Sequence, residues 1–361
     1  MKLTGLVRDS CGAAGAGIKL FFILLMLSLS SACTTLGPDF SRPEAAEPAE
    51  WSGDDTGTLG SETADRQDWW KVFNDPVMDR IVEKVYQQNL SLQVAGLRIL
   101  EARAQLGIAV GSQYPQLQQA GGSATRNRLS ENSPNYSPGV DKNFMAYQAG
   151  FDAAWEVDFW GRFQRGIEAA DANLSASVAD YNNALVSLTA EAARTYVIIR
   201  TLEERLMIAH ENIKLQEESL RIANVRFTNG ATTELDVQQA VSNLSETRAQ
   251  VPALSQTLRQ AKNSLCTLLG MPPSDLSEIL GGPGEIPVAA AHIAVGVPAE
   301  LLRRRPDVQF AEMQAASQSA LIGVARTELF PRFSLIGSIG YATSDTNSSS
   351  SGDLFDSCLL Y

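Results

Sequence analysis

The stretch ARTELFPRF at residues 325–333 decides the fold, because the chain also carries a related stretch, AVGSQYPQL, at residues 109–117. In each stretch a helical pattern ends at an aromatic residue that is followed by proline: Tyr114 before Pro115, and Phe330 before Pro331. Proline cannot continue a helix, and it disfavours the helical conformation of the residue before it. Each stretch therefore predicts an elbow at which a helix stops and an element of another type starts.

The element after the first elbow alternates with a period of two. From residue 145 to residue 159 the odd positions are all apolar, while the even positions include Gln148, Asp152, Glu156 and Asp158. Ordinary strands average about five to six residues, whereas about 9 to 11 residues cross a bilayer. The length favours a strand of a membrane β-barrel over a strand of a soluble sandwich, which would show the same alternation. The preceding segment, LQQAGGSATRN, is a candidate for the partner strand.

The longest predicted element is a helix at about residues 162–227. Apolar residues recur there at alternating spacings of four and three, from Leu174 to Phe227, which is typical of a coiled-coil seam. At about 1.5 Å per residue, such a helix is about 100 Å long. A second helix with the same rhythm covers residues 237–268, and Pro252 predicts a kink in it.

The segment between these helices, TNGATT, has the composition of a tight turn. Gly230 suits the left-handed conformation that caps a helix, and Thr233 with Asp236 has the pattern of a capping box for the next helix. The two helices are therefore predicted to form an antiparallel hairpin.

The two elbows belong to an internal repeat. Aligning Pro115 with Pro331 sets an offset of 216 residues, and a Gly- and Ser-rich alternating stretch follows each proline. The match extends backwards through identical pairs: Gln93 with Gln309, Ala95 with Ala311, Ala104 with Ala320, Gly107 with Gly323, and Ala109 with Ala325. The repeated unit is helix, strand, loop, strand and long hairpin. Residues 69–285 form the first repeat and residues 286–361 the start of a second one.

The first 32 residues have the form of a secretory signal peptide. An apolar run of about ten residues within LFFILLMLSLSSAC is too short to remain as a spanning helix. The segment resembles a bacterial lipoprotein signal, which makes Cys33 the candidate for lipidation, with an ordinary cleaved signal as the alternative. Thr34 follows the cysteine where Asp would suggest retention in the inner membrane, so the outer membrane is favoured. Residues 33–68 are rich in Pro, Gly, Ser and acidic residues and are predicted to be an extended, lipid-anchored tether.

Composition and motifs exclude several classes of function. The net charge of -12 indicates that the chain lacks the basic surface of a nucleic-acid-binding protein. The four cysteines and two histidines show no zinc-ligand spacing, so no metal site and no cofactor are expected, and Cys266 is expected to be a buried, inert thiol. No P-loop, nucleophile elbow or HExxH motif is present. No catalytic residues are identified, and the chain is not expected to be an enzyme.

Several stretches together resemble the TolC-type outer membrane factors, and specifically their NodT-like lipoprotein branch: LGPDFSRP, RFTNGATTELDVQQA, and RRRPDVQFAE with the FP elbow. The resemblance covers nearly all of residues 33–345. It implies a fold that is mainly α with a β part, in a homotrimer whose protomers each give four strands to a shared twelve-stranded membrane barrel, continued by a helical tunnel across the periplasm. It also implies that the hairpin tip contacts a periplasmic adaptor protein, which links it to an inner-membrane pump. The residues that match the family's tip motif are Arg226, Phe227, Gly230, Leu235, Asp236 and Val237.

The second repeat is expected to be incomplete. Adding 216 to Asn143, near the start of the second predicted strand, gives 359, whereas the chain ends at Tyr361. The fourth strand and the second hairpin are then missing, and SGDLFDSCLLY departs from the family pattern as a frameshift or early stop would make it do. Unpaired backbone groups in hydrocarbon cost about several kcal/mol each. The truncated chain is therefore expected not to form a conducting channel, although an intact relative would.

These features predict an outer membrane channel subunit of a tripartite efflux system, lipid-anchored and extending into the periplasm, that passively exports small molecules and drugs. Asp152, Glu156 and Asp158 on the polar strand face are candidates for lining the lumen and favouring cations, with a merely hydrated interior as the alternative. Two other functions stay open: a type I protein secretion duct, and a structural coiled-coil lipoprotein without a transport role. The pair of elbow-plus-strand units argues against the latter.

Overall fold

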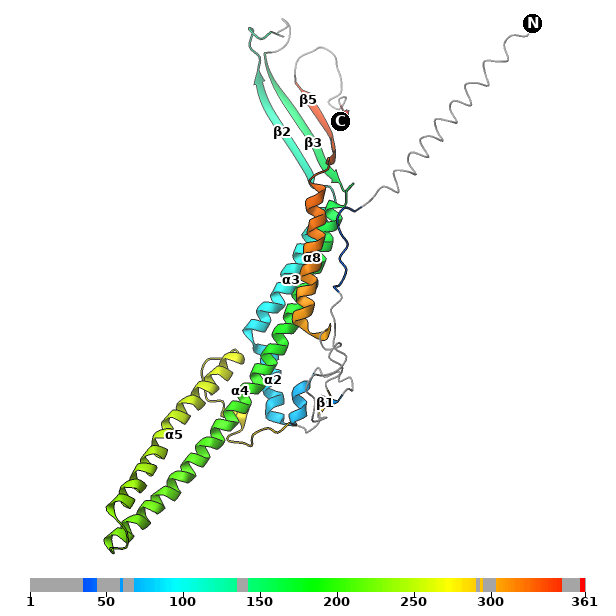
Figure 1. The fold of residues 1–361 in the computed structure, drawn as a ribbon. Coiled ribbons are helices and arrows are strands. Elements are labelled where there is room, and N and C mark those ends of the chain that lie inside the picture. Colours follow the sequence, from blue (N-terminus) through cyan, green and yellow to red (C-terminus); the bar gives the residue numbers. More distant parts are fainter. Residues whose placement is uncertain are drawn as a thin grey trace, which may run out of the picture. The chain divides into compact units, whose positions relative to one another are not determined.

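The computed structural model describes residues 35–43, 59–60, 68–134, 142–289, 293–294, 303–345 and 358–360. The signal segment 1–32 and Cys33 lie outside the described residues. In chain order the elements in Figure 1 are β1 (Leu59–Gly60), η1 (Trp69–Phe73), α2 (Pro76–Gln88), α3 (Leu90–Gly111), β2 (Leu117–Arg128), β3 (Asn143–Val157), α4 (Arg162–Thr228), α5 (Glu234–Leu268), α6 (Ser277–Leu280), β4 (Ile293–Ala294), α8 (Pro306–Thr327), β5 (Phe333–Ser344) and β6 (Cys358–Leu360). The fold is mainly helical with a small antiparallel sheet, as predicted.

The internal repeat is present in the structure. Adding the predicted offset of 216 to the bounds of α3 (90 and 111) gives 306 and 327, which are the bounds of α8. The same addition to the bounds of β2 (117 and 128) gives 333 and 344, which are the bounds of β5. Both helices have 22 residues and both strands have 12. The second helix, elbow and strand therefore begin and end at the positions that the first ones predict.

The sheet has the strand order β2-β3-β5-β6, and all neighbouring strands are antiparallel. The predicted strand at residues 145–159 is observed two residues earlier, as β3, and the segment proposed as its partner is β2. A short β6 pairs with β5 through Tyr341 opposite Cys358. The expectation that the fourth strand is missing is therefore corrected to this extent: a strand starts at Cys358, one residue before the position that the repeat predicts.

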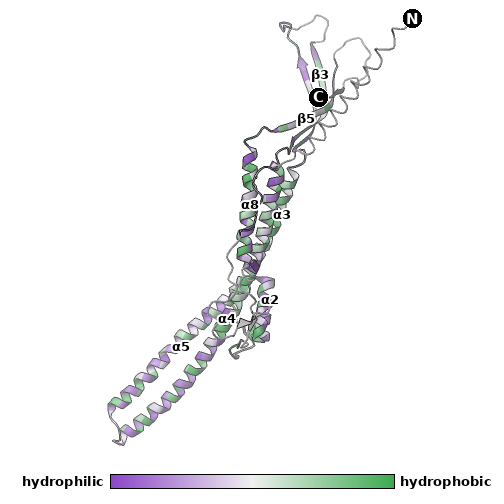
Figure 2. Cartoon of the chain, turned by 45° about the vertical axis from the view of Figure 1, so that its right-hand side comes forward, coloured by the Kyte–Doolittle hydropathy of each residue, from purple (hydrophilic) through white to green (hydrophobic). Residues whose placement is uncertain are grey.

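The long hairpin consists of α4, with 67 residues, and α5, with 35 residues, and Figures 1 and 2 show the two helices side by side. The ion pair between Arg248 Nη2 and Glu217 Oε1, 2.6 Å apart, links them. Helix α4 runs without interruption over the predicted range, and Pro252 lies inside α5. In Figure 2 hydrophilic and hydrophobic residues alternate around both helices, as expected for a helix with one packed face.

The apolar core next to this hairpin is built around α2. Asp75 caps the helix, since its Oδ1 accepts hydrogen bonds from the backbone N–H of Val77 at 2.7 Å and of Met78 at 3.1 Å, and Pro76 fits the first turn. The buried face of α2 follows helical spacing and packs with residues of α4, α5 and the segment around α6: Met78, Ile81, Val82, Val85, Ala192, Ala193, Tyr196, Ile199, Leu265, Cys266, Leu269, Leu276 and Leu280. Cys266 is a buried free thiol, as predicted.

The chain divides into two compact units that cut across the repeats. The sheet-bearing unit comprises Met1–Arg42, Glu101–Leu174 and Met313–Tyr361, and the hairpin unit comprises Pro43–Leu100 and Ser175–Glu312. Each unit contains residues of both predicted repeats, because α3, α4 and α8 each contribute residues to both units. Within the part of the chain that the structure describes, no helix is both long and apolar enough to cross a membrane.

Candidate functional site

One face of the sheet is apolar and exposed. Odd-numbered residues of β3 lie opposite odd-numbered residues of β5, so Phe151 faces Ile339 across the strands and Trp155 faces Leu335. Phe151 is 66% exposed and Leu335 is 61% exposed. A contiguous patch of large apolar side chains of this kind is rare on a surface that meets only water. This face is suited to contact with an apolar medium.

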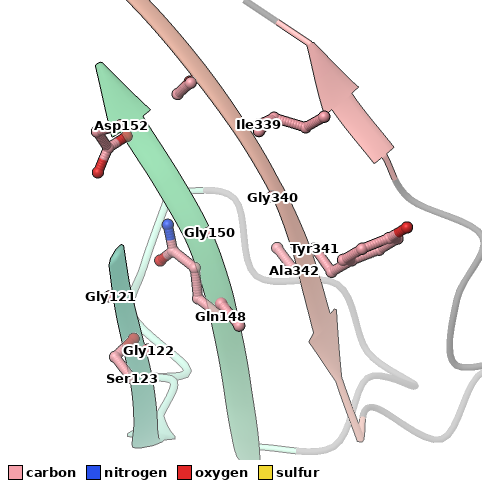
Figure 3. Close-up of a pocket in the computed structure, with 12 residues that line it drawn as sticks. Gly121, Gly122, Ser123, Gln148, Gly150, Asp152, Ile339, Gly340, Tyr341 and Ala342 are labelled. Carbon is pink, nitrogen blue, oxygen red and sulfur yellow. The ribbon is translucent and has the colours of Figure 1, made fainter. Parts of the chain in front are cut away.

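The opposite face of the same strands is mostly polar. It carries the even-numbered residues of β3, including Gln148 and Asp152, and Asp152 lies between Gln119 of β2 and Ser338 of β5. An open hollow of about 510 Å³ runs along these strands. Its lining includes Asp152, Gln148 and Ser123, which Figure 3 labels. Ile336 is an exposed apolar exception on this face. The arrangement gives the sheet one side for lipid and one for water.

The three predicted lumen residues have different environments. Asp152 is exposed on the polar face. Glu156 lies on the same face, but its Oε1 is 3.1 Å from Nη1 of Arg162, so its charge is paired. Asp158 is not on the strand, because β3 ends at Val157, and its Oδ2 accepts a hydrogen bond from the backbone N–H of Gln164 at 2.8 Å. The placement of Asp158 on the strand face was wrong, since its carboxylate satisfies a free N–H in the first turn of α4.

The two predicted elbows lie between the repeated helices and strands. Tyr114 and Pro115 separate α3 from β2, and Phe330 and Pro331 separate α8 from β5. Tryptophan indoles donate hydrogen bonds to both elbows. Nε1 of Trp155 is 3.0 Å from the carbonyl oxygen of Gln113, and Nε1 of Trp160 is 2.9 Å from that of Pro331.

The second elbow also carries an aromatic cluster. The ring of Trp160 lies 4.8 Å from that of Phe330 and 5.0 Å from that of Phe159, and Phe159 lies 5.6 Å from Phe333. Aromatic rings with a polar tip prefer the boundary between an apolar medium and water. Trp160 is the member of this cluster with such a tip, which makes the cluster a candidate for a boundary region at the start of the sheet.

The hairpin tip turns at Gly230, whose φ of 66° is left-handed, as predicted. The backbone N–H of Ala231 donates to the carbonyl oxygen of Arg226 at 2.8 Å and closes the end of α4. The predicted capping box is present at the start of α5, where the backbone N–H of Thr233 donates to Oδ2 of Asp236 at 3.1 Å. Sequence reasoning thus identified the residues that shape the turn.

The six tip residues divide into surface residues and structural ones. Leu235 is 74% exposed and Phe227 is 42% exposed, and Arg226 is exposed as well. Val237 is buried, so its side chain packs inside the hairpin. Hydrogen bonds from the hydroxyl of Thr232 and from Thr233 hold the pKa of Asp236 below its usual value. Among the six residues, Arg226, Phe227 and Leu235 have exposed side chains to which no role in shaping the turn is assigned.

The hairpin unit contains a buried polar network that was not predicted from the sequence. The side chain of Arg200 is 3% exposed and donates to Oε2 of Glu203 at 2.9 Å, to the carbonyl oxygen of Leu280 at 2.7 Å and to the hydroxyl of Tyr196 at 3.2 Å. That hydroxyl donates to Oδ2 of Asp75 at 2.7 Å. Burial raises the pKa of Tyr196, against the effect of Arg200. The sequence indicates the burial of Arg200 only through its neighbour Ile199, which the spacings of four and three that start at Leu174 place in the coiled-coil seam.

No group of three or more His, Cys, Asp and Glu side chains that could hold a metal ion occurs among the described residues. The features that the described residues do form are a lipid-compatible sheet face, a polar face behind it, two elbows and an exposed hairpin tip.

Comparisons with known proteins agree with this arrangement. Residues 81–271 match the family model described as outer membrane efflux protein. Nodulation protein T of Rhizobium leguminosarum bv. trifolii is 32% identical over 324 residues, which are 88% of this chain and 66% of the relative. The pyoverdine export outer membrane protein OpmQ of Pseudomonas aeruginosa is 33% identical over 322 residues, which are 87% of this chain and 67% of the relative. The chain spans about two thirds of the length of these curated relatives.

Among solved structures, the outer-membrane channel OprN superimposes with a TM-score of 0.79 at 32% sequence identity. The superposition covers 91% of this chain and 72% of the OprN chain. The similarity therefore extends over the sheet, the elbows and the long hairpin together.

Proposed function

Because the chain belongs to the outer membrane efflux protein family, we propose that it is a subunit of an outer membrane channel that exports small molecules. Relatives that carry names for pyoverdine export and toluene efflux support the class of cargo without identifying it. The channel is a passive duct without a catalytic step, and an inner-membrane pump supplies the energy.

The single observation that carries the proposal is the exposed apolar face of the sheet. Strands β2, β3 and β5 have 12, 15 and 12 residues, more than the about 9 to 11 that a tilted membrane strand needs. The apolar face that β3 and β5 form, with Phe151 and Leu335, meets lipid, and the polar face of the sheet meets water inside a barrel shared by three copies of the chain. Among the described residues of that inner face, Asp152 is a carboxylate without an ion pair, and it biases the lumen towards cations.

The hairpin of α4 and α5 forms part of a helical tunnel in the periplasm. Its exposed tip residues, Arg226, Phe227 and Leu235, contact a periplasmic adaptor protein. Gly230 and Asp236 act there by shaping the turn, and Val237 by packing inside it. The exposed charge and apolar surface of the first three residues support this division of roles.

We also propose the organisation of the N-terminal part that the sequence predicts. Residues 1–32 are a signal peptide, Cys33 is the lipidated residue, and residues 33–68 lead from the lipid to the first repeat at residues 69–285. The second repeat starts at residue 286. The small residues before the cysteine and the short apolar run support lipidation.

Two neighbouring residues on opposite faces of β3 provide the test. Phe151→Lys places a charge on the lipid face, where a lysine at the bilayer midplane costs about 2–4 kcal/mol. Asp152→Lys, the matched control, places the same side chain on the aqueous face. Only Phe151→Lys is expected to deplete the full chain from the outer membrane fraction of cells. Equal recovery of both variants in that fraction would contradict the proposed faces.

Partners separate this proposal from the two alternatives. Crosslinking at Leu235 in cells is expected to capture an adaptor protein together with an inner-membrane pump. Capture of an export ATPase instead would favour a protein secretion duct. Outer membrane recovery without any export-system component would favour a structural lipoprotein.

A further inference from the structure

The segment directly after the predicted lipidation site is docked and does not behave as a free tether. Residues 35–39, here called the strap, lie in the sheet-bearing unit against the start of α4 and the end of α8. The backbone N–H of Leu36 donates to the carbonyl oxygen of Trp160 at 3.1 Å. The strap is therefore tied to the residue at the centre of the aromatic cluster.

Arg165 of α4 holds the strap with three further contacts. Its side chain is 4% exposed. Its Nε donates to the carbonyl oxygen of Leu36 at 3.1 Å, and its Nη2 donates to that of Gly37 at 3.3 Å and to Oδ1 of Asp39 at 2.7 Å. Its Nη1 is 2.7 Å from Oε2 of Glu168, which places the guanidinium from the other side. A buried guanidinium directed at two backbone carbonyls fixes the path of the strap.

Two glycines allow the strap to lie this close to α8. Gly37 has a φ of 102°, and a Cβ on it would lie 2.4 Å from Cα of Gly323. A Cβ on Gly323 would lie 2.6 Å from the carbonyl oxygen of Leu36. Gly107, which the repeat aligns with Gly323, has no atom within 4 Å of the corresponding position. The close approach is thus specific to the strap and is not required by the repeat itself.

We propose that Arg165 locks the strap onto the second elbow, so that a lipid on Cys33 enters the membrane at the level of the Trp160 cluster. Cys33 precedes Leu36 by three residues, and three extended residues span at most about 11 Å. The lipid is then attached near the aromatic cluster that marks the boundary between lipid and water. The lipid half of this inference rests on the proposed lipidation, whereas the lock does not.

Amide hydrogen exchange of the full chain in detergent micelles tests the lock. Gly323→Ala is expected to expose the amide of Leu36, whereas the matched variant Gly107→Ala leaves it protected. Arg165→Ala is expected to speed exchange at Leu36 by at least about tenfold, as the loss of one hydrogen bond to a charged donor would. Exchange at the amides of β3, which pairs with β2 on one side and with β5 on the other in the same unit, reports on folding and stays unchanged. Unchanged protection of Leu36 in both Gly323→Ala and Arg165→Ala would overturn the lock.

Depth-dependent quenching tests the level of the lock in the membrane. In a variant that keeps Trp160 as its only tryptophan, reconstituted into phosphatidylcholine vesicles, lipids brominated near the headgroup are expected to quench Trp160 more than lipids brominated near the chain end. Equal quenching, or none, would overturn the placement at the membrane surface.

Incorporation of labelled palmitate into the wild-type chain, with Cys33→Ala as the control, tests the lipid separately. Absence of label would overturn lipidation and the lipid half of the inference, while the exchange pattern still decides the lock.

Discussion

Replacing Arg200 with methionine tests whether the buried network holds the hairpin unit together. Methionine keeps much of the side-chain volume but removes every hydrogen bond that Arg200 donates. The carbonyl oxygens of Leu280 and Gly282 then lose their donor inside the protein, and Glu203, whose side chain is 9% exposed, loses its closest cation. The variant therefore leaves buried acceptors and a buried charge without their partner.

The cost can be estimated from these contacts. Breaking a buried ion pair by removing one partner costs about 3–5 kcal/mol, and an orphaned buried carbonyl costs about 1–3 kcal/mol. Nζ of Lys262 lies 3.4 Å from Oε1 of Glu203 and keeps part of the charge neutralised. The loss is therefore expected at about 3–4 kcal/mol, which lowers the melting temperature of a unit of this size by about 10 °C.

Thermal unfolding followed by circular dichroism of the detergent-solubilised chain measures this loss. Arg194→Met on the same helix is the matched control, because the side chain of Arg194 is 70% exposed and its pair with Glu191, at 3.3 Å, is a surface pair. Such pairs contribute about 0–1 kcal/mol. Similar melting temperatures for Arg200→Met and Arg194→Met would refute the reasoning.

Two further predictions concern the tip and the sheet. Hydrogen bonds hold the pKa of the Asp236 carboxylate below its ordinary value of 3.8, so its cap is complete above that pH and is lost as the pH falls through the lower value. The protection factor of the Thr233 amide, which is its exchange rate relative to that of an unstructured chain at the same pH, should fall there, and Asp236→Asn should abolish this dependence. Gly340→Val should impair assembly into the outer membrane, measured as recovery in that fraction, because its Cβ would lie 2.8 Å from the carbonyl oxygen of Ala149, whereas Gly121→Val meets no atom within 4 Å and should be tolerated.

The elements that repeat with a clear period were predictable from the sequence. Period-two alternation identified β3, heptad spacing identified α4 and α5, and the two proline elbows identified the repeat to the residue. Each of these signals is local or arises from duplication, so one chain is enough to read it. The family resemblance then supplied the trimer, adaptor and lipid anchor as proposals.

The residues that fix tertiary contacts were not predictable in the same way. Arg165 and Arg200 occur in helices where a charged residue normally faces water, and their burial depends on segments 129 and 82 residues away in sequence. Asp158 was assigned to a strand face because alternation continues through it, although β3 ends one residue before. Periodicity does not record where the last ladder hydrogen bond is made.

The difference between Gly323 and Gly107 has a consequence for any ring built from this chain. The duplication gives the chain two helix-to-strand elbows, but the strap occurs once. The strap therefore braces the second elbow, whereas the position of Gly107, next to the first elbow, has no such contact. In a closed ring of identical copies, elbows braced by a strap would therefore alternate with elbows that lack one. The rotational symmetry of such a ring equals the number of chains and not the number of elbows. Successive elbows can then differ in stiffness, although their sequences arose by duplication.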